Sequence, residues 1–443
     1  MSFKIKDILH NKAKALLKIE TEPGLGCTDP AAIGLCSAAA ASLLKDRTIE
    51  SIKVIVSPNI YKNAMGVIIP ASGGERGIPM AAAMGSAAGD PANRLQVFST
   101  VDSGGLEKAK TLLKEGCVSA EIREGHAGVY VRTVVLAGGQ TAEAVIEGEH
   151  NHIKSLSLDG EPQKGHPLLA CVPEKETNVE DLEKWLISLS LGDIVALLDD
   201  LDSDDIFYVQ QGIDLNRALV EYGLTYGPGL GAGKSQQSLV RRGLIKTDMA
   251  FRGGMAAAAG IDSRMGGVDL PAMTLAGSGN QGIAAGMPIV AVAGFATLDD
   301  DFVLIRAVIL SYLITCYIKT RVGRLSALCG SAVASGAGVA AGVGYLLGGS
   351  VEKIGGAIMN HIENFSTIIC DGAKTGCALK VGEAASSAVK SALMALHGTV
   401  VRPADGIIDK GPEVTMCNVG RLTREGLSRM DATILDIMLR KGI

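Results

Sequence analysis

Ser51–Val56, with the sequence SIKVIV, places polar and apolar residues in the alternation of a β-strand. It marks a change of pattern, because residues 5–20 and 31–44 space their apolar positions as helices do. Four further strand signals follow, separated by glycines, at 118–122, 128–136, 142–147 and 153–158. We therefore expect an α+β region of several strands over residues 49–170.

Beyond Asn178 the strand pattern fades and helical segments punctuated by glycine or proline continue to the end of the chain. Residues 167–178 contain two prolines and are typical of a linker. We predict an α+β fold in which a mostly helical catalytic body carries an inserted α+β region. Its predicted parts are N-terminal helices that pack on the body (1–48), the α+β region (49–170) and an all-α domain (171–443).

Composition excludes several classes of partner. The 443 residues carry a net charge of −5, and acidic and basic residues are interspersed, so we expect neither a nucleic-acid nor an anionic-membrane partner. The first residues lack the apolar core of a secretory signal, which makes the cytoplasm the expected location. In that compartment the nine cysteines are expected to be metal ligands, catalytic groups or buried thiols rather than disulfides.

Two apolar segments are long enough to raise the question of a membrane span. Residues 331–350 carry no charge but are dominated by glycine and alanine, and residues 302–318 are interrupted by Arg306. A span needs about 20 strongly apolar residues. We therefore expect both segments to be buried core helices.

The cysteines that are candidates for metal binding or catalysis lie beside glycine or small polar residues. Ile369–Cys377, with the sequence ICDGAKTGC, holds Cys370 and Cys377 seven positions apart; Cys329 precedes Gly330, and Cys27 lies in a Gly/Asp-rich turn. Glycine allows a backbone to approach a bulky inorganic group, and thiolates in such loops can ligate an iron–sulfur cluster. The spacing is not that of a ferredoxin, so it does not establish a cluster by itself.

The remaining cysteines are less informative. Cys36, Cys117, Cys171 and Cys316 are expected to be packing residues, and the role of Cys417, which precedes Asn418, stays open. Cys27 differs because Thr28 or Asp29 can cap a helix directly after it. A helix N-terminus favours an anion, so we expect the pKa of Cys27 to be lowered.

Four polar or glycine-rich segments were weighed as binding sites. Gly227–Ser235 resembles a phosphate loop, but Pro228 stands where the Walker pattern needs glycine, which favours a plain loop. Gly277–Gly282 offers backbone N–H groups with Ser278, Asn280 and Gln281, which suits a substrate carboxylate, although a simple turn is the alternative. Ser57–Asn63 is either a substrate-binding segment or a solvated turn. Gly148–His152 lacks an evident third metal ligand, and we expect its polar side chains to lie in solvent at the protein surface.

Taken together, the motifs resemble a known family over nearly the whole chain. The segments that carry the resemblance are 26–30 (GCTDP), 276–282 (AGSGNQG), 328–330 (LCG), 370–377 (CDGAKTGC) and 417–421 (CNVGR). They are similar to the bacterial and archaeal L-cysteine desulfidases, which are relatives of the iron–sulfur L-serine dehydratases. The six residues between Cys370 and Cys377 form a shorter gap than serine dehydratases typically have. This gap and the 26–30 element favour the desulfidase branch.

The resemblance implies a [4Fe–4S] cluster held by Cys329, Cys370 and Cys377, with one iron open to act as a Lewis acid. It implies α,β-elimination of a small amino acid, L-cysteine, to sulfide, pyruvate and ammonia, without pyridoxal phosphate. Cys27 is the expected base for the Cα proton. The residues expected to hold the substrate are Asn59, Ser278 and Asn280.

Two other functions stay open at this point. One is an L-serine or related hydroxy-amino-acid dehydratase on the same scaffold, and the other is a non-catalytic iron–sulfur sensor. A homo-oligomer is compatible with the sequence, which does not define the oligomeric state.

Overall fold

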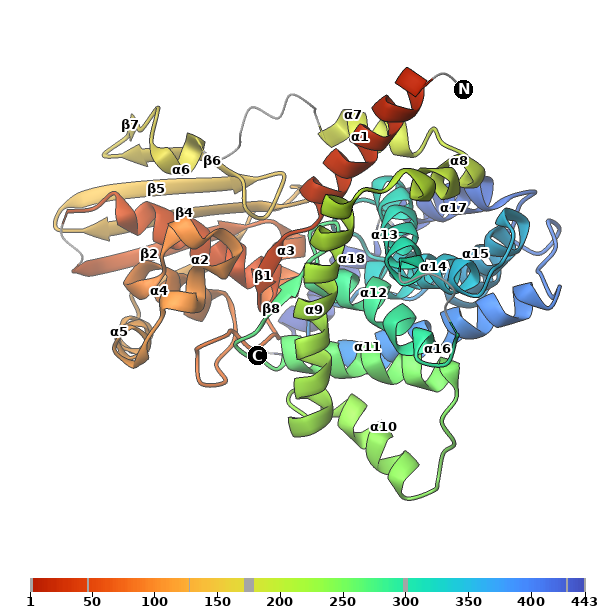
Figure 1. The fold of residues 1–443 in the computed structure, drawn as a ribbon. Coiled ribbons are helices and arrows are strands. Elements are labelled where there is room, and N and C mark those ends of the chain that lie inside the picture. Colours follow the sequence, from red (N-terminus) through yellow and green to blue (C-terminus); the bar gives the residue numbers. More distant parts are fainter. Residues whose placement is uncertain are drawn as a thin grey trace.

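The computed structural model describes residues 3–45, 48–126, 128–170, 179–297, 302–427 and 429–441. The chain forms two hydrophobic cores, one between a sheet and the helices on it and one within a large group of helices. Figure 1 shows the sheet part beside the helical body. The predicted α+β class, with a mostly helical body and one strand-rich region, is confirmed.

The sheet is built from the strands that the alternation predicted. β2 is parallel to β3 and antiparallel to β4, and the remaining neighbours are antiparallel, giving the order β3-β2-β4-β5-β6-β7. β2, β4 and β5 bury alternate residues over most of their length, which explains the period of two in their sequences. The bounds are β2 Ile49–Val56, β3 Val118–Ile122, β4 Tyr130–Ala137, β5 Gln140–Glu147, β6 Ile153–Leu158 and β7 Glu161–Pro162.

The helices of this part pack on the sheet or on one another. They are α2 Thr28–Ser42, α4 Ile78–Ala88, η1 Pro91–Thr100 and α5 Ser103–Lys114, with α3 Pro58–Ala64 and α6 Pro167–Ala170 at the margins. α2 and α4 touch at glycines, since a Cβ on Gly85 would lie 2.2 Å from the carbonyl oxygen of Gly34. α2 thus belongs to the core of the sheet part. This corrects the expectation that all of residues 1–48 packs on the helical body; the domain boundaries themselves stay a prediction.

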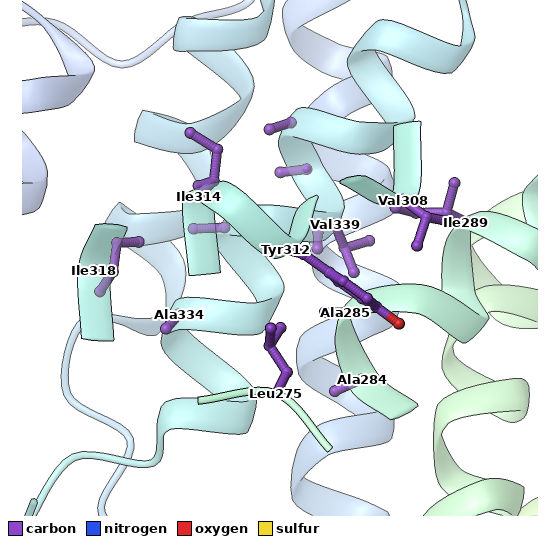
Figure 2. Close-up of a cluster of buried hydrophobic side chains, with 14 of the residues drawn as sticks. Leu275, Ala284, Ala285, Ile289, Val308, Tyr312, Ile314, Ile318, Ala334 and Val339 are labelled. Atoms are coloured by element: carbon purple, nitrogen blue, oxygen red, sulfur yellow. The ribbon is translucent and has the colours of Figure 1, made fainter. Parts of the chain in front are cut away.

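The other described helices lie outside the sheet part, and all of them except the last, which packs on α3, form the helical body. They are α1 Phe3–Glu20, α7 Val179–Leu186, α8 Leu191–Ala196, η2 Leu197–Asp200, α9 Ser203–Tyr226, α10 Ala232–Arg241, α11 Met249–Met265, α12 Gly279–Ala293, α13 Val303–Val322, α14 Gly330–Leu346, α15 Val351–Phe365, α16 Cys377–Leu396, α17 Pro412–Arg421, the π-helical turn η3 Leu422–Gly426 and α18 Met430–Leu439. Figure 2 shows the contact of α12, α13 and α14, where Tyr312 lies among Ala285, Ile289 and Val308.

The apolar helix α13 is a core helix. Among the described residues it is the one helix long and apolar enough to cross a membrane, with a mean hydropathy of 1.6, and 78% of that apolar stretch is buried within the protein. It packs on α12, α14 and α17. Burial against other helices accounts for its composition, so the expectation that residues 302–318 form a buried core helix is confirmed. Residues 331–350 were also expected to form a buried core helix, and most of them belong to the buried helix α14.

A small second sheet joins the two cores. β1 (Pro23–Leu25) pairs antiparallel with β8 (Pro271–Met273), although these strands lie far apart in the sequence. Gly26 follows with φ +66°, and a Cβ there would lie 2.4 Å from the ring of Pro70, so the turn requires glycine. The pairing brings the start of α2 next to the segment that leads into α12.

Candidate functional site

A cavity of about 100 Å³ lies where the two cores meet. Four thiols line it, and they come from both parts of the protein: Cys27, Cys329, Cys370 and Cys377. The structure therefore brings the three predicted cluster ligands together with the predicted base. The predicted substrate residues Asn59, Ser278 and Asn280 line the same cavity.

Four helices begin at this cavity. Cys27 directly precedes α2, Ser278 precedes α12, Cys329 precedes α14, and Cys377 is the first residue of α16. The first N–H groups of a helix have no partner within the helix and carry partial positive charge. The converging helix N-termini therefore make the cavity favourable for negatively charged groups.

Backbone hydrogen bonds hold two of the thiol-bearing loops side by side. The N–H of Cys329 donates to the carbonyl of Ile368 at 2.8 Å, and the N–H of Cys370 donates to the carbonyl of Ala327 at 2.7 Å. Cys377 follows in the same loop at the start of α16, with its Sγ 3.8 Å from the carbonyl oxygen of Gly372. These contacts define the relative positions of three cysteines that are up to 48 residues apart.

The glycines beside the thiols are required by close contacts. A Cβ on Gly330 would lie 2.2 Å from the side-chain oxygen of Gln281. Gly372 has φ +90°, and a Cβ there would lie 2.5 Å from the carbonyl oxygen of Lys62. Neither position accepts a side chain without displacing its neighbours.

The three clustered thiols are electrostatically unfavourable as thiolates by themselves. Burial, with smaller contributions from the neighbouring Cys370 and Cys377, raises the pKa of Cys329 to about 12. Burial also raises the pKa of Cys377. Binding a cationic metal group would remove both penalties. The donor set, three thiols with adjacent glycines in a cavity at helix N-termini, fits an iron–sulfur cluster with three protein ligands.

The pKa of Cys27 is raised, not lowered. Burial is the main cause and the carboxylate of Asp29 adds to it, while the charge of Arg264 acts in the opposite direction. The expectation that the N-terminus of α2 makes Cys27 a thiolate is therefore wrong for the protein without ligands. The cost of burying a thiolate exceeds the favourable field of the helix.

Cys27 is the first member of a buried line of proton-binding groups. Its Sγ donates to Asp29 Oδ2 at 3.5 Å, and Asp29 Oδ1 lies 3.4 Å from Nε2 of His150. Asn63 also donates to Asp29 at 3.3 Å. His150 is only 5% exposed, so the expectation that the polar side chains of Gly148–His152 lie in solvent is wrong for this residue. No periodic pattern marked it, because the contact arises from the packing of β5 and β6 on α2.

Asn59 is engaged by the C-terminal part of the chain. Its Nδ2 donates to Asp431 Oδ2 at 3.0 Å, and Lys62 contacts the other oxygen of Asp431 at 2.6 Å. Lys62 also donates to the carbonyl of Cys370 at 3.0 Å. These contacts connect α18 to α3 and to the loop that carries Cys370. Nothing in the sequence indicated this connection.

Ser278 and Asn280 follow a tight two-residue turn. Leu275 and Ser278 exchange two backbone hydrogen bonds of 3.0 Å, and the residues between them, Ala276 and Gly277, have φ +47° and +77°. Asn280 uses its Oδ1 to accept a hydrogen bond from Arg264 Nη1 at 3.0 Å. Sequence reasoning missed Arg264, which is buried on α11 and lines the cavity.

The segment Gly227–Ser235, which resembles a phosphate loop, has a structural role in the folded protein. The loop before α10 surrounds a carboxylate, and the N–H of Gly233 donates to Asp262 Oδ2 at 2.9 Å. Backbone N–H groups of neighbouring residues, including Leu230, favour the charged form of this carboxylate, although burial raises its pKa to about 6. The loop therefore serves α11, in agreement with the prediction of a loop between helices.

The packing predictions for the other cysteines hold where the structure describes them. Cys36 and Cys316 are buried, Cys117 is partly buried and Cys417 is exposed. Cys171 lies outside the described residues. A separate group of possible metal ligands, His10, Asp202 and Asp205, lies between α1 and α9, but Lys14 already pairs with both carboxylates.

Comparison with known proteins places the chain in a family. Residues 133–436 match the serine dehydratase alpha chain family. The chain belongs to this family. It is 45% identical to a UPF0597 protein of Desulfatibacillum aliphaticivorans over all of this chain and 99% of the relative. A UPF0597 protein of Desulfotalea psychrophila is 44% identical, covering 97% of this chain and 98% of the relative.

Family membership identifies a serine dehydratase-like lyase, of a family that typically depends on an iron–sulfur cluster. The family match covers the three clustered cysteines together with Arg264 and Asn280. Cys27 and Asn59 precede it. The groups contributed by α2 and α3 thus come from outside the matched region, although they line the same cavity.

Proposed function

We propose that this protein is a [4Fe–4S]-dependent L-cysteine desulfidase. The observation that supports it best is the cavity itself, where three clustered thiols face a fourth thiol at the junction of the two cores. In the proposed site Cys329, Cys370 and Cys377 hold the cluster. When bound, such a cluster with one open iron supplies a Lewis acid for the substrate's leaving group or carboxylate.

The reaction needs no net oxidation or reduction. Removal of the Cα proton places an electron pair on Cα, the Cα–Cβ double bond forms, and the Cβ–S bond breaks with its electrons on sulfur. L-cysteine then yields sulfide and aminoacrylate, and water converts the aminoacrylate to pyruvate and ammonia.

Cys27 is the proposed acceptor of the Cα proton, with a different physical basis from the one predicted. Its thiol is neutral at rest, so it must first pass its own proton to a neighbour. Asp29 accepts the hydrogen bond of Cys27, and His150 lies next to Asp29. We assign Asp29 and His150 the role of holding this proton while the Cys27 thiolate acts.

A second candidate is L-serine dehydratase on the same scaffold, which the family description favours directly. Both reactions eliminate a group from Cβ after removal of the same Cα proton, so the same residues serve either substrate. Comparing kcat/KM for L-cysteine and L-serine separates them. Sustained turnover of either amino acid eliminates a purely sensory role for the cluster.

The decisive experiment is anaerobic reconstitution with iron and sulfide. We expect a brown protein that releases sulfide from L-cysteine, and the Cys329→Ser, Cys370→Ser and Cys377→Ser variants should lose iron and activity. Cys417→Ser is the matched control, because Cys417 is exposed and does not line the cavity. A colourless protein with full activity would refute the proposal.

Cys27→Ser tests the base. Its iron content and visible spectrum should match those of the unsubstituted protein while sulfide release is lost. Loss of iron would instead show that Cys27 is a ligand.

The free thiols of the described cysteines are consistent with a cytoplasmic location, which we propose as well.

A further inference from the structure

We propose that Arg264 binds the α-carboxylate of the substrate through its Nε and Nη2 groups. This inference deepens the proposed function, since it rests on an amino acid as the substrate. It assigns a specificity-determining role to a residue that no sequence motif identified.

The position of Arg264 is unusual for an arginine. It lies near the C-terminal end of α11, its side chain is 2% exposed, and it lines the cavity together with Cys27. A buried guanidinium is costly unless anionic or hydrogen-bonding partners compensate for its lost hydration. The partners of this group therefore need to be counted.

Within the described residues the guanidinium is only partly satisfied. Nη1 donates to Asn280 at 3.0 Å, whereas Nε and Nη2 have no hydrogen-bond partner. Nε and Nη2 carry the two parallel N–H groups that engage a carboxylate side-on. The unsatisfied pair thus has the donor geometry that a carboxylate requires.

The nearest anionic groups do not supply that partner. Burial lowers the pKa of Arg264 and the carboxylate of Asp29 acts to raise it, but the oxygens of Asp29 are engaged by Cys27, Asn63 and His150. The burial of Arg264 therefore remains uncompensated by any direct ion pair in the part of the chain that the structure describes.

The other cations at the cavity are already bound. Lys62 pairs with Asp431 at 2.6 Å, and Arg324 makes two hydrogen bonds of 2.7 and 3.1 Å to Glu20. Lys319 donates to two backbone carbonyls at 2.5 and 2.9 Å. Arg264 is the lining cation whose charged face still has two donors to offer.

The surroundings also suit the proposed ligand. Gly279, the first residue of α12, packs on the guanidinium, and a Cβ there would lie 2.2 Å from Nε. A carboxylate bound at this point would lie beside the N-terminus of α12, which favours an anion. Arg264 is also close enough to Cys27 and Cys377 to interact electrostatically with both. A carboxylate held there would leave the adjoining Cα near the proposed base.

The test separates the carboxylate from the rest of the ligand. L-alanine and L-alaninamide lack a leaving group and differ in the carboxylate, so each can be titrated calorimetrically into the reconstituted protein without turnover. We expect L-alanine to bind and to compete with L-cysteine, and L-alaninamide to bind at least tenfold more weakly. Equal affinity for the two compounds would overturn the inference without any substitution.

Two substitutions then locate the contact. Arg264→Met should raise the KM for L-cysteine and weaken L-alanine binding about 10- to 100-fold, the range for losing hydrogen bonds to a charged group. Arg264→Lys keeps the charge but loses the fork, so its loss should be smaller. Arg252→Met is the control, because Arg252 is exposed on the same helix.

Stability distinguishes a ligand-binding arginine from a structural one. Without ligand, Arg264→Met removes an uncompensated buried charge, so its melting temperature should equal or exceed that of the unsubstituted protein. A structural arginine would give a lower melting temperature and an unchanged KM in Arg264→Lys, and that result would overturn the inference.

The outcomes also separate this inference from the proposed function. If the unsubstituted protein turns over neither L-cysteine nor L-serine but binds L-alanine in an Arg264-dependent way, the proposed function fails and the carboxylate site stands. If turnover occurs while L-alanine binding and KM are unaffected in both Arg264 variants, the proposed function stands and the carboxylate site is refuted.

Discussion

The neutral, buried His361 makes the stability of the helical body dependent on pH. His361 lies on α15, is fully buried, and contacts the carbonyl of Ala332 at 3.0 Å through Nε2. Its Nδ1 has no partner among the described residues. Burial lowers the pKa of His361 to about 4, although the contact with Ala332 acts in the opposite direction. A second proton would therefore create a buried charge whose new N–H has no acceptor.

The direction of the effect follows from the two protonation equilibria. The unfolded chain has a histidine pKa of about 6.5, so it binds the proton more readily than the folded protein does. The contribution of neutral His361 to the free energy of unfolding is therefore fully present above the pKa of the unfolded chain, and it is lost as the pH falls toward the pKa of the folded protein. With these two pKa values the loss between pH 7 and pH 5 is about 2 kcal/mol, and the full loss is about 3 kcal/mol.

The assay is urea unfolding followed by circular dichroism at pH 5, 6, 7 and 8. His361→Gln keeps an N–H donor for Ala332 but does not titrate, so its decline between pH 7 and pH 5 should be about 2 kcal/mol smaller than that of the unsubstituted protein. His397→Gln is the control, because His397 is exposed at the end of α16. Parallel pH profiles for His361→Gln and the unsubstituted protein would refute the reasoning.

Two further substitutions test contacts around the cavity. Asp431→Asn removes the ionic partner of Lys62. The side chain of Lys62 is 2% exposed and that of Asp431 is 27% exposed, so we expect the free energy of unfolding to fall by about 1–3 kcal/mol, less than for a fully buried pair. Amide hydrogen exchange in α18 should then be faster, measured by mass spectrometry. Gly330→Ala places a Cβ against the side chain of Gln281 and should lower the iron content after reconstitution, measured by iron analysis.

Each of these substitutions has a matched control. Asp436→Asn changes an exposed carboxylate on α18, so exchange within the helix should stay close to that of the unsubstituted protein. Gly192→Ala adds a methyl group in ordinary contact with its neighbours on α8, so iron content should be unaffected. Unchanged exchange in Asp431→Asn, or full iron content in Gly330→Ala, would contradict the corresponding assignment.

The strands and most helices could be predicted because their patterns are local. β2, β4 and β5 alternate in burial as their sequences alternate in polarity, and the apolar helix α14, rich in small residues, is buried as its composition indicated. Small polar or glycine neighbours marked five cysteines as candidates, and the resemblance to the desulfidases selected Cys329, Cys370 and Cys377 among them. The place of α2 was not predicted, because a helix buried on all sides has no polar face to show which core it joins.

The residues that complete the site could not be predicted from local sequence patterns. His150 contacts Asp29 only because the sheet and α2 pack together, and Arg264 is exceptional only because its donors lack partners. The raised pKa of Cys27 depends on burial, which the helix position of the residue did not reveal. Each of these properties depends on neighbours that are remote in the sequence.

The sequence by itself determined the α+β class and the strand-rich region, because side-chain periodicity acts over a few residues, whereas the choice of three thiols as cluster ligands came from the resemblance to a family. Only the tertiary structure decided that Cys27 faces Cys329, Cys370 and Cys377 across one cavity, since the pairing of β1 with β8 joins segments from two cores. It also decided the protonation state of Cys27 and the unmet donors of Arg264. Desolvation and hydrogen-bond satisfaction are set by the complete surroundings of a group, and those surroundings exist only in the folded chain.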